Sequence, residues 1–221
     1  MISDRLKQIG DFIPLDNIGV ADIGSDHGKV LLYILSRGFK GRLLGVENKK
    51  GPYDGLKSAI SGTPIEASLS DGLEKIDETI DTLIIAGMGF LNIKSIITEN
   101  SNKLVYIKDI IVDSHNNIPE CRKFFTEIGY FIYNEKIVYE NNVYYEILHF
   151  QKGRKVYDEV DIKYGPILRK NRNSVYLDKY NKILMNLNSL LPKIGNDAVK
   201  KQEIEEEIES IQRELWKHYR Y

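Results

Sequence analysis

Three observations in the amino-acid sequence predict a doubly wound α/β domain followed by a helical hairpin. Short apolar runs alternate with amphipathic helical stretches over residues 1–128, as is typical of parallel strands joined by crossover helices. Two β-rich runs then follow each other directly, and from about residue 158 the chain loses strand character. At 221 residues with 42% hydrophobic side chains, the chain can form one such domain and an appendage, so wholesale disorder is excluded.

The elements of the α/β part follow in order along the chain. Ser3 begins a short amphipathic helix that carries Leu6, Ile9 and Phe12 on one side. The apolar runs at 18–23, 43–46, 64–67, 82–86 and 109–112 are the expected parallel strands. The expected helices between them are 27–37, 53–61, 92–98 and 119–128, with a short turn at 72–76.

The end of the sheet distinguishes between two kinds of doubly wound fold. The runs 130–139 and 143–150, joined by Glu140-Asn141-Asn142, predict a β-hairpin. A mostly parallel sheet that ends in an antiparallel pair is more typical of class I (Rossmann-like) methyltransferases than of nicotinamide-binding Rossmann domains. We therefore expect a class I fold over residues 1–153.

The remaining residues, 154–221, predict a coiled-coil hairpin of two long helices. Two sets of apolar residues share the spacing 4, 3, 4 and are separated by a turn with Pro192 and Gly195-Asn196. These sets are Tyr180, Leu184, Leu187 and Leu191, and Ile204, Ile208, Ile211 and Leu215.

Charge nearly cancels over the chain but is unevenly distributed. The 31 basic and 32 acidic residues leave a net charge of −1, which excludes a uniformly basic nucleic-acid binder. Residues 1–150 carry −5 and residues 151–221 carry +4, with 10 basic against 4 acidic residues over 152–193. This basic stretch indicates an acidic partner for the tail.

Other function classes are disfavoured by what the sequence lacks. One cysteine, Cys121, excludes an internal disulfide, and 4 scattered histidines leave no metal-ligand spacing, so we expect no metal. No apolar run approaches the roughly 20 residues that cross a bilayer, and the N-terminus lacks the apolar segment of a signal peptide. We expect a soluble, cytoplasmic protein without membrane contact.

The segment Val20-Ala21-Asp22-Ile23-Gly24-Ser25-Asp26-His27-Gly28 joins the first strand to a helix, where doubly wound sheets bind ligands. Gly24 and Gly28, on either side of Ser25, let backbone approach a ligand closely. A dinucleotide fold would need G-x-G-x-x-G here, whereas Asp22 and Asp26 would repel a pyrophosphate. Carboxylates can instead hold an amino group or lie near a sulfonium, which favours S-adenosylmethionine over NAD.

Further polar residues follow the next strands. Glu47, with Asn48 behind it, ends the second strand, where a carboxylate accepts both ribose hydroxyls. Asp71 and Gly72 follow the third strand, where an aspartate can accept from an adenine amino group. Gly87-Met88-Gly89 closes the fourth strand, at the edge that faces the methyl group and the target atom in methyltransferases.

Each feature also has a simpler interpretation. The glycine-rich segment is compatible with an ordinary β-turn, and Glu47 with a solvated strand end. Met88 could fill the core, and His27 could cap its helix. We favour a binding site because all four features occur in order, each at the carboxyl end of a strand.

The same residues carry a resemblance to a known family. The motifs are Ser3-Asp4-Arg5-Leu6, Ala21-Asp22-Ile23-Gly24-Ser25-Asp26-His27, Gly51-Pro52-Tyr53, Asp71-Gly72-Leu73, Ile85-Ala86-Gly87-Met88-Gly89, Tyr144-Tyr145-Glu146-Ile147 and Tyr164-Gly165-Pro166. Together they resemble the TrmK family of bacterial tRNA (adenine-22, N1)-methyltransferases over nearly the whole chain. The resemblance implies a Rossmann-like body, a C-terminal coiled coil, S-adenosylmethionine as methyl donor and tRNA as substrate.

Two positions depart from the family pattern. The family tends to have Gly-Met-Gly-Gly, whereas Phe90 takes the last place here. It usually has Gln-Pro-Asn after the fifth strand, where this chain has Asp113-Ser114-His115-Asn116. His115 is either a replacement polar contact to the substrate or an exposed loop residue, and we favour the former.

The implied reaction suggests roles for particular residues. Adenine N1 is nucleophilic when unprotonated, so alignment and exclusion of water matter more than a strong base. We expect Asp26 to stabilise the ring charge or accept the amine proton, with His27 beside it. We expect tRNA contacts from Arg5, His115, Lys152, Arg154, Lys155, Arg169, Lys170 and Arg172.

Two rival functions remain open at this point. A nicotinamide-dependent oxidoreductase is disfavoured by the missing G-x-G-x-x-G. A non-catalytic RNA-binding or assembly protein is disfavoured by the intact Asp22, Glu47 and Asp71. The basic tail also admits a solvated face or self-association in place of RNA binding. We expect a monomer.

Overall fold

The computed structural model describes residues 2–195 and 197–216. The chain divides into two compact units, Met1–Pro166 and Ile167–Tyr221, which are described separately. Asn196, part of the turn expected between the last two helices, lies outside the described residues, as do residues 217–221 of the expected C-terminal domain.

The described part of the first unit is built on a seven-stranded sheet with the order β3-β2-β1-β4-β5-β7-β6. Every neighbouring pair is parallel except those of β7, which runs antiparallel to both β5 and β6. The strands are β1 (Gly19–Ile23), β2 (Arg42–Glu47), β3 (Glu66–Leu69), β4 (Thr82–Met88), β5 (Asp109–Ser114), β6 (Tyr130–Glu140) and β7 (Val143–Lys152). The predicted fold class is confirmed, including the antiparallel ending.

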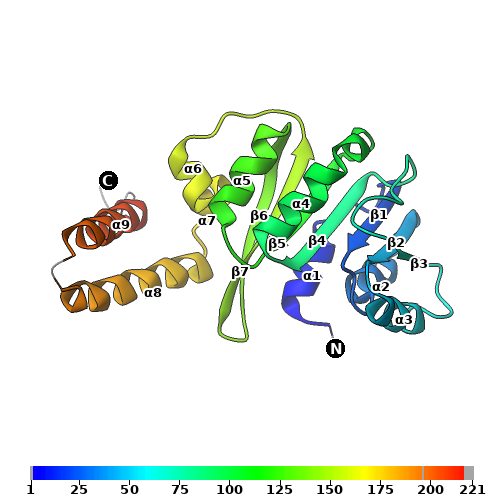
Figure 1. Ribbon diagram of the computed structural model, residues 1–221, viewed down its shortest axis with the longest axis horizontal. Helices are drawn as coiled ribbons and strands as arrows, with labels where there is room; N and C mark the ends of the chain where they lie inside the picture. Colours follow the sequence, from blue (N-terminus) through cyan, green and yellow to red (C-terminus); the bar gives the residue numbers. More distant parts are fainter. Residues whose placement is uncertain (1, 196, 217–221) are drawn as a thin grey trace. The chain divides into compact units, whose positions relative to one another are not determined.

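Helices cover both faces of this sheet (Figure 1). On one face lie α1 (Asp4–Asp11), α2 (Lys29–Ser36) and α3 (Lys50–Ala59), and on the other α4 (Phe90–Glu99) and α5 (Ile118–Glu127). Ser3 caps α1 by accepting a hydrogen bond from the N–H of Leu6. The strand order reverses between β1 and β4, so a crevice is expected at their carboxyl ends.

A buried ion cluster holds the segment after β7 against α5. The fully buried guanidinium of Arg122 contacts Glu135, with 2.7 Å between Nε and Oε1, and Glu146. Its Nη1 donates to the carbonyl oxygens of Ile162 and Lys163 in helix α6 (Glu159–Tyr164). Residues 154–166 therefore pack with the first compact unit, which extends to Pro166. The domain boundary after residue 153 stays a prediction.

The second unit is helical in its described residues. It contains most of α7 (Pro166–Asn171), then α8 (Ser174–Leu190), a short 3-10 turn, and α9 (Ala198–Trp216), which packs on α8. Tyr180, Ile208, Ile211 and Leu215 from the predicted seams are buried. Glu214 is buried as well, although it lies outside the apolar pattern.

Candidate functional site

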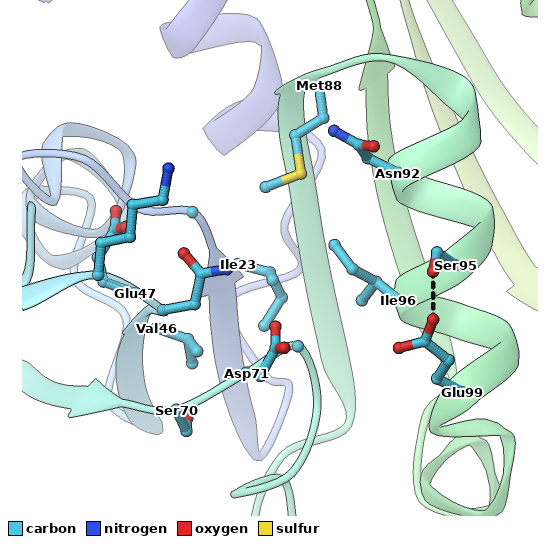
Figure 2. A pocket seen from close by; sticks show the side chains of 14 residues that line it. Ile23, Val46, Glu47, Ser70, Asp71, Met88, Asn92, Ser95, Ile96 and Glu99 are labelled. Carbon is cyan, nitrogen blue, oxygen red and sulfur yellow. Dashed lines mark hydrogen bonds between the residues drawn. The ribbon is translucent and has the colours of Figure 1, made fainter.

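A cavity of about 550 Å³ opens at the predicted crevice, over the carboxyl ends of β1, β2 and β4. Figure 2 shows side chains of α4 facing Glu47 and Asp71 across this space. The strand-end residues of the wall are Ile23, Gly24, Val46, Glu47, Asn48, Lys49, Ser70, Asp71, Gly72 and Met88, and α4 contributes Asn92, Ser95, Ile96 and Glu99.

Gly24 is required where β1 and β4 approach each other. Its φ of +74° lies in the left-handed region, and a Cβ there would collide with the methyl group of Met88. The Gly24 N–H donates to the carbonyl oxygen of Val46 at 2.8 Å, so the turn is also tied to β2. The absence of a side chain keeps this wall of the cavity open to a ligand.

The carboxylates under this turn are buried together. Glu47 is 8% exposed, and its Oε1 accepts a hydrogen bond from the backbone N–H of Asp26 at 2.6 Å. Burial raises the pKa of Glu47. Asp22 lies deeper, where Ser25 Oγ donates to its Oδ2 at 2.8 Å, and burial raises the pKa of Asp22 to about 7. Such a cluster gains from a bound hydroxyl or amino donor, which is the chemistry S-adenosylmethionine offers.

Asp26 and His27 follow each other in this turn, and both side chains are largely exposed. Asp26 has a positive φ of 51°, and its side chain is 70% exposed, with Oδ2 at 3.8 Å from Lys29 Nζ. The ring of His27 lies beside Gly55 on α3, and its Nε2 is 3.6 Å from Asp26 Oδ1. Asp26 is therefore available to a substrate at the edge of the crevice, whereas His27 packs toward α3.

The loop after β5 is joined to the loop after β4. The N–H of His115 donates to the carbonyl oxygen of Met88 at 2.9 Å, and the amide oxygen of Asn116 accepts from the N–H of Phe90 at 3.0 Å. The exposed His115 ring lies over the open side of Gly87, whose φ is +75°. Gly89 begins α4 against Asn116. These contacts fix the two loops that departed from the family pattern.

Only some of the residues predicted to bind the cofactor line the cavity. Gly24, Glu47, Asn48, Asp71, Gly72 and Met88 line it. Asp22, Ser25, Gly87 and Gly89 support or adjoin its walls and are not part of the lining. Gly28 is the N-cap of α2, with a φ of +64°. A Cβ at this position would collide with Ile60 and Leu56, so Gly28 allows α2 to approach α3 closely rather than a ligand.

Sequence reasoning missed the α4 wall. Asn92, Ser95, Ile96 and Glu99 recur at helical spacing on one face, which the sequence does contain as a signal. Ser95 and Glu99 hydrogen-bond to each other within that face (Figure 2). The spacing identifies a face, but only the packing of α4 on the sheet shows that this face meets the cavity.

Several of the basic residues predicted to contact tRNA have partners within the protein. Arg5 forms an ion pair with Asp113, 2.6 Å between Nη1 and Oδ2, and stacks over the ring of Tyr145. Burial raises the pKa of Asp113, and Arg5 opposes that shift. Arg5 thus ties α1 to the end of β5, in addition to any role toward a substrate.

Lys152, Arg154 and Lys155 lie at the opposite edge of the sheet from the cavity. Because β7 is antiparallel, its last residues pair with the beginning of β5, and Lys152 N donates to the carbonyl oxygen of Lys108. Lys152 Nζ also donates to the carbonyl oxygens of Leu104 and Val105. The structure therefore does not bring these residues together with the methyl-donor site.

In the second unit, two of the predicted tRNA contacts surround Glu214. Arg169 Nε lies 2.9 Å from Glu214 Oε2, and Arg172 Nη1 lies 3.3 Å from Oε1. Tyr176 donates its hydroxyl to the same carboxylate at 3.0 Å. Lys170, between the two arginines, is exposed.

Metal-binding clusters and membrane-spanning helices are both absent from the described part of the chain. Within it, no group of three or more His, Cys, Asp or Glu side chains could hold a metal ion. None of the helices described is both long and apolar enough to cross a membrane.

Strand order, an antiparallel seventh strand between β5 and β6, and an acid-lined cavity at the switch point define the class of protein. The chain is a class I S-adenosylmethionine-dependent methyltransferase. A family model described as tRNA (adenine(22)-N(1))-methyltransferase matches residues 20–213, and the chain belongs to this TrmK family.

Relatives of known sequence or structure agree. The chain is 29% identical over 209 residues to the tRNA (adenine(22)-N(1))-methyltransferase of Bacillus subtilis, covering 89% of this chain and 87% of that protein. It resembles Streptococcus pneumoniae Sp1610, solved with S-adenosyl-L-methionine, with TM-score 0.88 and 28% identity over 97% and 100% of the chains. It also resembles Mycoplasma capricolum TrmK, solved with S-adenosyl-homocysteine, with TM-score 0.86 and 26% identity over 97% and 98%. The predicted family, enzyme class and cofactor are confirmed.

Proposed function

We propose that this chain methylates N1 of adenosine 22 in tRNA through a target site at the edge formed by Asp26, Gly87 and His115. The single observation that supports this placement is the cavity whose lining includes Gly24 after β1 and Met88 at the end of β4. The proposal comprises a monomeric, cytoplasmic enzyme that uses no metal.

The residues present fit S-adenosylmethionine. Glu47 and Asp71 offer carboxylates for hydroxyl or amino donors, and Ile23, Val46 and Ile96 offer apolar surface for a flat ring. When bound, the cofactor supplies an electrophilic methyl group on a sulfonium. The chain contributes the shape that aligns this group and the side chains that exclude water from it.

Asp26 carries the electrostatic part of the reaction. As the N1–CH₃ bond forms and the S–CH₃ bond breaks, positive charge moves onto the adenine ring. A carboxylate at the edge of the crevice stabilises that charge and can accept a proton from the exocyclic amine. The Asp26 side chain is 70% exposed, and its Oδ2 lies 3.8 Å from Lys29 Nζ.

His115 supplies the wall for the target base. Adenine N1 is concealed in Watson–Crick pairs, so the base must be unpaired or swung out. The His115 ring is exposed beside Gly87, and its backbone is held by Met88, which also lines the cofactor cavity. A swung-out adenine that stacks on this ring would lie beside the methyl donor.

Basic side chains hold the RNA backbone in this proposal. Lys170 and Arg154 are exposed cations in the predicted set. Changing one phosphate contact to glutamine should lower the slope of log Kd for tRNA against log salt by about 1. A slope unchanged by Lys170→Gln and by Arg154→Gln would remove both residues from the interface.

The deciding experiment is transfer of a labelled methyl group from S-adenosylmethionine to unmodified bacterial tRNA, followed by nucleoside analysis. We expect 1-methyladenosine, and no incorporation when adenosine 22 is replaced by guanosine. Incorporation that survives this replacement would place the target elsewhere. Cofactor binding without any incorporation would instead favour a non-catalytic role.

A further inference from the structure

A second cavity, of about 340 Å³, lies at the amino edge of the sheet, away from the cofactor site. It is lined by the end of α1 and the loop after it, by Arg37 after α2, and by β6 and β7. The length of β5 separates its floor from the cofactor edge by roughly 17 Å, at ~3.3 Å per residue. Its volume falls within the range of small-molecule sites, about 300–1,000 Å³.

The floor of this cavity contains the buried imidazole of His149, which is paired with the carboxylate of Asp109 behind the lining. His149 is 1% exposed, and its Nε2 lies 2.6 Å from Asp109 Oδ1. Although burial opposes ionisation, hydrogen bonds from His149, Gln151 and Asn17 lower the pKa of Asp109. Because Asp109 is a carboxylate, the His149 Nε2–H donates to it, and Nδ1 is the ring nitrogen that this carboxylate does not occupy.

Two aromatic rings flank this imidazole. Phe12 lies with its ring centroid 5.7 Å from that of His149, and Tyr133 meets His149 edge-to-face at 5.0 Å. Tyr133 is 51% exposed and occupies the register shift between Ile132 and Asn134 on β6. Bulges of this kind re-aim a side chain, and here the ring joins the cavity wall. The walls therefore suit a flat ring.

The remaining polar groups of the cavity indicate which hydrogen-bonding groups and which charge a bound ring should have. The Asn134 side chain oxygen accepts from the N–H of Glu135 at 2.9 Å, so its NH₂ group is left for an acceptor. At the rim, Arg37 lies 3.7 Å from Asp11, and its Nη1 donates to the carbonyl oxygen of Gly10. The rim charges compensate each other, so the cavity does not require a charged ligand.

We propose that this cavity binds an uncharged, flat nitrogen heterocycle of nucleobase size, stacked on Tyr133 with a hydrogen-bonding edge toward His149. The ligand places a ring nitrogen or an attached polar group toward Nδ1 of His149 and an acceptor toward the Asn134 NH₂ group. Two sources present this chemistry, a free nucleoside and an unpaired base of the RNA substrate. The site is distinct from the methyl-donor cavity and does not depend on the proposed reaction.

The test uses the full-length protein with ¹⁵N-labelled histidine and with the cofactor cavity saturated by S-adenosylhomocysteine. Adenosine is titrated to about 5 mM while the histidine ring signals are followed by NMR. We expect the His149 signals to shift saturably with Kd below about 1 mM, whether or not the signals of His115 also shift, because the proposed function places a target adenine at His115. Ribose alone should shift none of them. Constant His149 signals would overturn the proposal.

A matched pair of variants tests the stacking wall. Tyr133→Ala should weaken adenosine binding at least about tenfold. Tyr106→Ala removes a comparably exposed tyrosine, at 39%, that does not line the cavity and should leave binding unchanged. Equal binding by wild type and Tyr133→Ala would contradict the proposed site. S-adenosylhomocysteine affinity serves as the folding control in both variants.

Methylation kinetics separate the two sources. A raised KM for tRNA in Tyr133→Ala, with kcat unchanged, would assign the site to an RNA base. An unchanged KM together with weakened adenosine binding would assign it to a free nucleoside. If no methyl transfer occurs at all, the proposed function fails, while the NMR result still decides this site.

Discussion

Acidic residues end or begin strands at both edges of the sheet, yet their surroundings differ. At the amino edge, Asp81 accepts from the N–H groups of Ile18 and Gly19, and Asp109 accepts from His149. At the carboxyl edge, the pKa values of Asp22 and Glu47 are raised by burial. Strand-end acids at the amino edge accept several hydrogen bonds from the protein and so stabilise the fold. Asp22 and Glu47 at the carboxyl edge have fewer such donors, which leaves them available to a ligand.

The largest effect is expected from removing a satisfied carboxylate at the amino edge. Asp81→Ala leaves the Ile18 and Gly19 N–H groups without their acceptor and should lower the free energy of unfolding by about 3 kcal/mol. Urea denaturation measures this loss. Asp16→Ala, at an exposed nearby position, is the control and should cost under ~0.5 kcal/mol. Weakened cofactor binding by folded Asp81→Ala would contradict a purely structural role for Asp81.

At the carboxyl edge the same kind of change should affect binding. Glu47→Gln keeps the size of the side chain but removes the charge that faces the cavity. We expect about 30-fold weaker S-adenosylhomocysteine binding by calorimetry, roughly 2 kcal/mol. Glu66→Gln changes an exposed acid on β3 that pairs with Arg42, and its affinity should match the wild type. Equal affinities for all three proteins would refute a ligand role for Glu47.

A substitution at Asp26 should affect methyl-transfer turnover much more than cofactor binding. Asp26→Ala should reduce kcat for tRNA methylation at least about tenfold, ~1.4 kcal/mol in activation free energy, because charge on the adenine ring loses its counter-charge. Its Kd for S-adenosylhomocysteine should change less than about twofold, since only the backbone N–H of Asp26 contacts Glu47. Asp26→Asn, which retains tolerance of the positive φ, controls for backbone strain. The reverse pattern would make Asp26 a cofactor ligand only.

The smallest effect is a difference in pH dependence between the edges. The folded pKa of Asp22, about 7, exceeds the unfolded value of roughly 3.9, so its contribution lowers stability as pH rises between them. Asp109 has a lowered pKa, so its contribution is present above the unfolded value and is lost as pH falls through the folded pKa.

Denaturation of the cofactor-free protein as a function of pH measures both contributions. Asp22→Asn should gain about 1 kcal/mol over the wild type at pH 8 and nothing at pH 4. A gain that is the same at both pH values would show that Asp22 does not titrate in this window.

The sequence predicted the strand ends of the site because alternation and glycine positions are local signals. The 64–67 strand is displaced to Glu66–Leu69, and the hairpin was expected without its place in the sheet. Register between β5 and β7 depends on long-range pairing, which no local pattern contains.

The partners of the predicted side chains could not be identified from the sequence. The basic residues Arg5, Arg169 and Arg172 are identifiable by charge, but their acidic partners lie 108, 45 and 42 positions away in the chain. Likewise, helical spacing shows that Asn92 and Glu99 share a face, and only tertiary packing turns that face toward the cavity. Roles that depend on such contacts require the structure.

The insertion of β7 between β5 and β6 has a consequence for synthesis on the ribosome. Ile110, Ile111 and Val112 of β5 are fully buried in the finished sheet, and the outer edge of that strand is closed only by β7. A nascent chain that has emerged only as far as β6 therefore exposes an unpaired apolar edge, which favours aggregation. Folding of this half of the sheet must wait for the last strand, so premature termination before Lys152 would yield a protein dependent on chaperones.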